Sequence, residues 1–193
     1  MTIKQGPAPI HWNYFLTLDA DTANLSRYID FAEDNFDAYS VEMARILLAA
    51  SSEVDVVSKL LCKKINPKSK ARNIDDYRIE INGAIPTFAN MEVIIPRYAL
   101  TLYPWENWSK NINPDWWAAY NAVKHERNEN FKLASLHNTL NSVGALLVML
   151  LHFYSDQARD GDLLPSPSLY SLGDSHIRGF AQKGAALAVL YNV

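Results

Sequence analysis

The segment Ser40–Ile65 has the strongest helical pattern in the chain, and it constrains the fold more than any other feature. Ser40 can cap the start of a helix. Lys63 and Lys64 suit the negative potential at its carboxyl end, and Pro67 stops it. A helix of this length with one apolar face buries that face against other helices, which predicts a helical bundle. The apolar face is formed by Ile46, Leu47, Ala50, Val54, Val57 and Leu61.

Two shorter helices are expected in the first half of the chain. One covers about Ala20–Ala32, with Asp19 and Asp21 near its start, where the helix dipole favours negative charge. The other runs from Asn73, which can cap it, to about Asn82. The first has Leu25, Tyr28, Ile29 and Phe31 at nearly helical spacing.

Two further helices are expected between Pro114 and Tyr154. The first covers about 114–128, with Asn113 as its cap and Pro114 at its first position. The second covers about 132–154 and contains the most apolar run of the chain, Val143–Tyr154. This run is too short to cross a bilayer, which takes about 20 residues. It therefore predicts a buried helix.

The remaining segments predict an insertion and a tail. Within the insertion, about 66–112, β-branched and aromatic residues on both sides of Pro96 predict a β-hairpin or extended strands over the core. The tail, about 155–193, is broken by Pro and Gly, and one short helix is expected near Ala181–Leu190. The expected fold is all-α: one domain over 1–193, a helical bundle with a small extended or β-hairpin insertion.

Composition narrows the classes of function. The formal net charge of −3 argues against a protein that coats nucleic acid, because phosphate binding depends on positive surface. The single cysteine, Cys62, rules out an intrachain disulfide and fits an inert core thiol in a reducing compartment. The five histidines lack metal-ligand spacing, so no metal and no cofactor is expected. The chain starts without a signal-peptide pattern, so we expect a cytoplasmic protein that does not bind membranes.

Polar residues on the expected 114–128 helix form the main candidate site. At about 100° per residue, Asn121, Lys124 and His125 share one face. Arg127 lies about 200° from His125 on a continuous helix. His125 and Arg127 can therefore act together only if the helix ends or bends between them, or if they meet across a subunit interface. The adjacent Tyr120 belongs to the apolar face.

Companions for this face are expected on the two long helices. Glu53 lies at the edge of the apolar face of 40–65, and Arg45 lies on a neighbouring face. Asn138 and Asn141 lie on a polar stripe of 132–154. Since buried polar groups need partners, a network that links Glu53, Asn121, His125 and one of these two asparagines is a hypothesis. The alternative is that each polar residue makes its hydrogen bonds locally, at the surface or between two neighbouring helices. In that case the tryptophans serve to pack the core.

The sequence Asn121–His125 (NAVKH), followed by a long apolar helix, resembles the HEPN superfamily. The helix with Glu53, "ARILLAASSEVDVVSKLLC", is similar to it as well, and the resemblance covers about Ser40–Lys64 and Asp115–Tyr154. It implies a small helical bundle, often a homodimer, frequently in toxin–antitoxin, antiphage or stress systems. Many members are metal-independent endoribonucleases. In these the resemblance implies a His that acts on the ribose 2′-OH and an Arg that stabilises the phosphate.

No Arg precedes His125 at the spacing of the family, where this chain has Tyr120 or an alanine. The first hypothesis is therefore a HEPN-like binding module for RNA, a nucleotide or a protein partner. Its candidate binding residues are Glu53, Arg45, Asn138, Asn141 and Tyr120. The first alternative is a metal-independent endoribonuclease that uses His125, near Asn121, with Lys124 or Arg127. The second alternative is an unrelated helical interaction protein.

Overall fold

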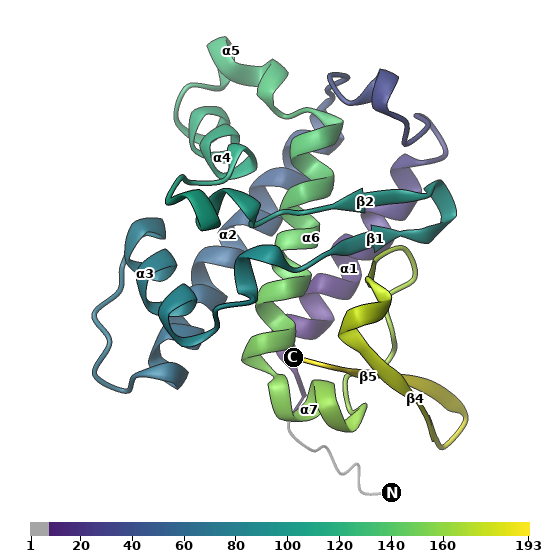
Figure 1. The fold of residues 1–193 in the computed structure, drawn as a ribbon. Helices are drawn as coiled ribbons and strands as arrows, with labels where there is room; N and C mark the ends of the chain where they lie inside the picture. The colour runs from purple at the N-terminus through teal and green to yellow at the C-terminus, as the bar shows by residue number, and fades with distance from the viewer. Residues whose placement is uncertain (1–7) are drawn as a thin grey trace, which may run out of the picture.

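The computed structural model describes residues 8–193, which form a helical bundle flanked by two small antiparallel sheets (Figure 1). Its central helices are α2 (Val41–Ile65) and α6 (Leu136–Phe153), which contact one another more extensively than any other pair of helices. Helices α1 (Ile10–Leu25) and α4 (Asp115–His125) each pack against both. The predicted dominance of helices is confirmed. The strands of the insertion are part of the prediction, whereas the three strands of the tail are not, so the all-α class is corrected for the tail.

Helix α6 is the core of the bundle. Every residue from Thr139 to His152 is buried, and the Ser135 hydroxyl caps the helix by accepting a hydrogen bond from the Asn138 N–H at 3.3 Å. Within residues 8–193, α6 is the one helix long and apolar enough to cross a membrane, and most of it is buried inside the protein. This burial agrees with the predicted role of Val143–Tyr154 as a core helix.

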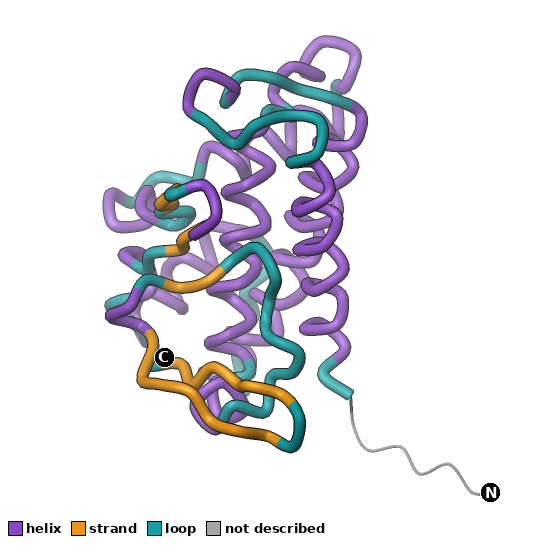
Figure 2. The backbone as a smooth tube through the Cα atoms, turned by 90° about the vertical axis from the view of Figure 1, so that its right-hand side faces the viewer, coloured by secondary structure: helices purple, strands orange, loops and turns teal. Residues whose placement is uncertain are grey.

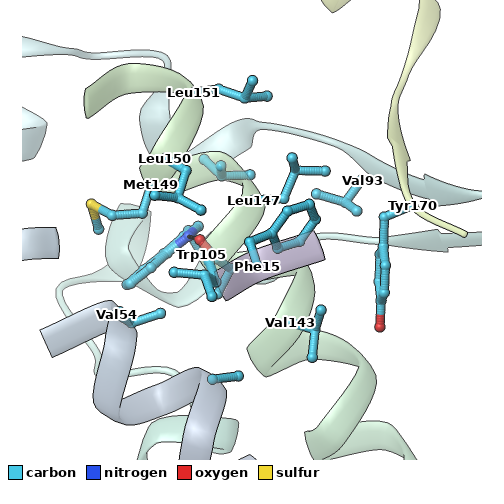
Figure 3. Close-up of a cluster of buried hydrophobic side chains, with 14 of the residues drawn as sticks. Phe15, Val54, Val93, Trp105, Val143, Leu147, Met149, Leu150, Leu151 and Tyr170 are labelled. Atoms are coloured by element: carbon cyan, nitrogen blue, oxygen red, sulfur yellow. Dashed lines mark hydrogen bonds between the residues drawn. The ribbon is translucent and has the colours of Figure 1, made fainter. Parts of the chain in front are cut away.

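The tryptophans that the sequence marks as packing anchors join the insertion to the bundle. Trp105, Trp108 and Trp116 are buried, and the Trp105 ring lies 4.2 Å from that of Trp108 between centroids. The Trp105 indole N–H donates to the Ala145 carbonyl of α6 at 3.2 Å. Figure 3 shows Trp105 among side chains from α1, α2 and α6. The predicted anchor role is confirmed for these three residues, while Trp117 is only half-buried.

Two helix starts agree with their predicted caps. The Ser40 hydroxyl accepts from the Met43 N–H at the start of α2. The Asn73 side chain accepts from the N–H groups of Asp75 and Asp76 at the start of α3 (Ile74–Ala84). A serine or asparagine at this position satisfies backbone donors that have no partner inside the helix.

Two other helix starts differ from the prediction. The first helix begins at Ile10 and ends at Leu25, instead of covering 20–32, so Asp19 lies inside it and is buried. Asn113 does not cap α4, because its side-chain oxygen accepts from Arg78 at 2.7 Å. The second difference arises from a tertiary contact that outweighs a local start signal.

The hairpin predicted around Pro96 is confirmed. Strands β1 (Val93–Ile95) and β2 (Leu100–Leu102) pair antiparallel, and Pro96 opens a 3₁₀ turn between them. A third strand, β3 (Ser171–Leu172), comes from the tail and pairs with the other edge of β1. The tail therefore belongs to the same sheet as the insertion.

The helix predicted near Ala181–Leu190 is wrong. After the short helix α7 (Ser155–Asp160), the tail forms a hairpin of β4 (Ile177–Lys183) and β5 (Ala186–Tyr191). Gly184 takes φ +62° in the turn, a conformation that other residues rarely adopt. Side-chain exposure along β4 alternates with a period of two, as expected of a strand with one covered face. Figure 2 shows the strands on one side and at one end of the helices.

Candidate functional site

A helix break at Glu126 shapes the region that the sequence singles out. Helix α4 ends at His125, and Glu126 has φ −138° and ψ 57°, outside the helical range. The short helix α5 (Arg127–Asn130) follows immediately. The break removes the continuous helix that would hold Arg127 and His125 on different faces. Both side chains, together with Lys124, line one hollow of about 540 Å³.

Arg127 and Asn128 also line a larger depression of about 910 Å³, which we call the Arg127 groove. It is formed by residues of α1, of the first half of α2 and of the segment after α4. Most of its wall is apolar, with one aromatic ring, Tyr14, from α1 and another, Phe131, from the segment after α5. The lining residues are Tyr14, Val41, Ala44, Arg45, Leu48, Ala49, Ser52, Arg127, Asn128 and Phe131.

The two arginines of the groove differ in charge compensation. The Arg45 guanidinium donates to Glu42 on its own helix and to Asp21 at 2.6 Å. The hydrogen bond from Arg45 lowers the pKa of Glu42, and the two carboxylates raise the pKa of Arg45. Arg127, by contrast, has no ion pair and no side-chain hydrogen bond within residues 8–193. It is the uncompensated cation of the groove.

Lys124 is held at the rim of the hollow by Tyr120. Its ammonium donates to the Tyr120 hydroxyl at 3.2 Å and lies 5.2 Å from the centre of the tyrosine ring. Tyr120 itself is buried in a small apolar cluster with Leu47 and Val123. Tyr120 therefore positions Lys124 rather than offering a contact surface of its own.

The network predicted around Glu53 does not form. The Glu53 carboxylate pairs with His11 Nδ1 of α1, and the His11 ring packs edge-on against Phe153 with 5.9 Å between centroids. His125 is exposed and lines the hollow that it shares with Lys124 and Arg127, so it does not contact Glu53. The start of α1 at Ile10, instead of near Ala20, is the reason that a histidine outside the predicted elements reaches Glu53.

The three asparagines of the hypothesis are also satisfied separately. Each donates its side-chain N–H to a backbone carbonyl four or five residues earlier in the chain, which is a common local pattern. None of them bonds to Glu53 or His125 in the described part of the chain. The bonds are Asn121 to Trp117 at 2.9 Å, Asn138 to Leu133 at 3.0 Å and Asn141 to His137 at 3.0 Å.

Cys62 is buried, and burial first, then nearby Glu80, raises the pKa of its thiol to about 12. The predicted core position of Cys62 is confirmed, and the raised pKa favours the thiol over the reactive thiolate. Among residues 8–193 no three His, Cys, Asp or Glu side chains are grouped so as to hold a metal ion.

The structure thus brings Lys124, His125 and Arg127 together, with Tyr120 behind Lys124 and Arg45 in the groove that Arg127 lines. It leaves Glu53 and the three asparagines outside this group. Sequence reasoning missed Tyr14, because the helix that carries it begins ten residues earlier than predicted. The apolar spacing of Trp12, Phe15, Leu18 and Leu25 is the signal for that earlier start. Comparisons with family models, with curated proteins and with solved structures find no match to this chain.

Proposed function

We propose that this chain is a HEPN-like binding module that takes a nucleotide, free or within a short single-stranded RNA, in the Arg127 groove. The observation that carries the proposal is the uncompensated guanidinium of Arg127, which borders both the groove and the hollow that contains His125. A planar guanidinium without a protein partner suits a phosphate group, which it can bind through two parallel hydrogen bonds.

The lining of the groove also suits a nucleobase. Tyr14 and Phe131 place aromatic rings on its lining, and base stacking on such rings contributes about 1–3 kcal/mol per base. The remaining wall is mostly aliphatic, which suits the faces of a base more than its polar edges. A volume of about 910 Å³ is within the usual range for small-molecule sites.

The charge balance favours a small ligand over a long nucleic acid. Lys124 and Arg127 stand in the hollow beside Glu126 and Glu129, so the local positive charge is limited. With a formal net charge of −3, a long RNA gains little from counterion release on this protein. We therefore infer that the module contacts one or a few nucleotides.

The experiment is a binding titration with two probes, AMP and a fluorescein-labelled single-stranded oligouridylate of about eight nucleotides. Arg127→Ala is expected to weaken binding about tenfold or more and to reduce the salt dependence by about one phosphate contact. Arg72→Ala is the matched control, since this exposed arginine follows the opposite end of α2. Absence of wild-type binding to both probes, or equal weakening in the control, rules the proposal out.

A second pair of variants tests the aromatic contribution. Phe131→Ala is expected to weaken binding of the oligouridylate by about 1–3 kcal/mol, the contribution of one stacked base. Phe180→Ala removes an exposed phenylalanine of similar size from strand β4, outside the groove. Equal effects of the two variants would show that the ring of Phe131 does not stack on the ligand.

The helix break favours one further candidate, a metal-independent endoribonuclease. The break lets His125 share a hollow with Lys124 and Arg127. In this candidate His125 accepts the proton of the ribose 2′-OH, whose oxygen attacks the adjacent phosphorus while the bond to the 5′-oxygen breaks. Lys124 or Arg127 stabilises the phosphate charge. The leaving 5′-oxygen takes a proton from water, so the products are a 2′,3′-cyclic phosphate and a free 5′-hydroxyl.

This candidate is tested with RNA and a chelator of divalent metals. Cleavage by the wild type that is lost in His125→Ala, with binding retained, would support it. A folded wild type that binds RNA and leaves it intact would contradict cleavage while leaving the binding proposal standing. If neither RNA nor AMP binds, the remaining alternative is a helical interaction protein.

We also propose a homodimer, which the resemblance to the HEPN superfamily implies. Light scattering gives a direct test, because one chain has a mass of 21.8 kDa and a dimer twice that value. A monomer at micromolar concentration would contradict the dimer and would confine the site to residues of one chain.

A further inference from the structure

A second cavity lies at the other end of the bundle, where the tail meets the ends of α2 and α6. Its volume is about 580 Å³, and none of its lining residues belongs to the Arg127 groove or to the hollow at His125. The cavity has four basic side chains and no Asp or Glu in its lining. The four are Lys64, His152, Arg159 and His176, which come from four different elements.

The two permanent charges, Lys64 and Arg159, are held in place by hydrogen bonds. The Lys64 ammonium donates to the Phe153 carbonyl at 2.8 Å and to the Ser155 hydroxyl at 3.0 Å. The Arg159 Nε donates to a backbone oxygen of Val193, the last residue of the sequence, at 2.8 Å, and Arg159 also contacts the exposed Asp156 at 3.4 Å. The acceptors of Lys64 are neutral, so its positive charge is available to a ligand, and the exposed contact with Asp156 compensates little of the charge of Arg159.

The wall behind the charges includes the buried ring of His152. Its Nε2 lies 2.9 Å from Met91 Sδ, and the ring packs 5.2 Å from that of Phe88. Burial, followed by the charges of His176, Arg159 and Lys64, lowers the pKa of His152 to about 4. Three basic groups on separate elements therefore act on the same small volume.

The lining also has an apolar part. Leu61, Ile65 and Ile85 lie beside the basic residues. Like charges gathered around one cavity raise the free energy of the folded protein, and a bound anion offsets that cost.

We propose that this cavity binds a small amphipathic anion, with a phosphate or carboxylate group on Arg159 and Lys64 and an apolar body against Leu61, Ile65 and Ile85. The hydroxyls of Ser155, Thr87 and Ser175 line the same space and add donors. This site is separate from the Arg127 groove, so each can bind when the other does not.

The test is calorimetry on the whole chain with three probes: phenyl phosphate, octanoate and the neutral 1-octanol. At least one anion is expected to bind, and 1-octanol is expected to bind more weakly than either. Stronger binding of phenyl phosphate identifies a phosphate site, and stronger binding of octanoate a carboxylate site. Binding of 1-octanol as tight as both anions would overturn the proposal.

Two variants locate the site. Arg159→Ala and Lys64→Ala are each expected to weaken the preferred anion about tenfold, the loss of one charge-assisted contact. Arg27→Ala is the control, because this exposed arginine lies outside the lining of the cavity. Equal weakening in Arg27→Ala would show binding to general positive charge and would overturn the assignment.

A second readout covers the case in which Arg159→Ala loosens the tail. The NMR signals of the His152 ring in the wild type are expected to shift on addition of the preferred anion and to saturate with the calorimetric curve. Unchanged His152 signals, or no binding of either anion up to about 10 mM, overturn the proposal.

Discussion

The carboxylate of Asp19 in α1 accepts two hydrogen bonds from Ser168 in the tail, from its backbone N–H at 2.7 Å and from its hydroxyl at 2.6 Å. The same carboxylate accepts from the N–H groups of Leu169 and Tyr170, both at 3.1 Å. Asp19, Leu169 and Tyr170 are buried, so the N–H groups of Leu169 and Tyr170 have no access to water as a replacement, whereas Ser168 is exposed. One side chain thus holds a turn of the tail against the first helix, 149 residues away in the chain.

Replacement of Asp19 by alanine is expected to lower the free energy of unfolding by about 3 kcal/mol, because it leaves two buried N–H donors, those of Leu169 and Tyr170, without an acceptor. Urea unfolding measures the change. Asp37→Ala is the matched control, since Asp37 is exposed. Proteolysis should also cut the tail near Ser168 faster in Asp19→Ala. Similar stability of the two variants would show that Asp19 does not hold the tail.

A pair of glycine substitutions tests how tightly the tail packs. Gly161 has φ +73°, and an added Cβ would lie 2.8 Å from Leu190 Cδ2 and 3.1 Å from Ala188 Cβ. Gly161→Ala is therefore expected to destabilise the protein by about 1–3 kcal/mol through backbone strain and overpacking. Gly83 is in α3 with open space around it. Gly83→Ala is expected to stabilise by about 0.5–1 kcal/mol, so opposite shifts in melting temperature are the predicted outcome.

The buried His152 predicts a dependence of stability on pH. Its pKa is about 4 in the folded protein against an ordinary value of 6.5, so the unfolded chain binds the proton more readily. The contribution of His152 to stability is complete above about pH 6.5 and is lost as the pH falls to about 4. A shift of this size corresponds to about 3 kcal/mol.

The measurement compares wild type with His152→Leu by urea unfolding between about pH 7 and pH 4. In the variant, the free energy of unfolding is expected to fall less steeply between pH 7 and pH 4 than in the wild type, because the contribution of His152 is missing. This expectation holds whatever the stability of the variant at pH 7. The groups that act on His152 are Lys64 from α2, Arg159 from α7 and His176 from the tail, and all three remain in the variant. Equal slopes in the two proteins would contradict burial of a neutral histidine.

The pairing of Glu53 with His11 predicts which histidine responds to a change at Glu53. In Glu53→Gln, the NMR signals of the His11 ring are expected to shift, because its Nδ1 contacts the replaced carboxylate. The signals of the His125 ring are expected to stay in place, since His125 lies in the hollow after α4. A shift at His125 and none at His11 would restore the network expected from sequence.

Much of the candidate site could be anticipated, but not its shape. The spacing of Asn121, Lys124 and His125 located the region on α4. The sequence also indicated that His125 and Arg127 can lie in one site if the helix ends between them, as it does in the structure. Nothing in "KHERNEN" fixes that end at Glu126, because the segment contains neither Pro nor Gly. The groove needed Tyr14 and Arg45 from two other helices, and no local spacing relates those residues to Arg127.

The sequence by itself determined the helix α2 with its Ser40 cap, most of the helix α6, and the extended or hairpin character of the segment around Pro96, because apolar periodicity, N-caps and turns are set by residues a few positions apart. The tertiary structure decided the rest. It placed Ala181–Leu190 in the β4–β5 hairpin, added β3 to β1 and gave Asp19 its partner in Ser168. Strand pairing and the satisfaction of buried polar groups join segments up to 149 residues apart, and which segments meet depends on how the whole chain packs.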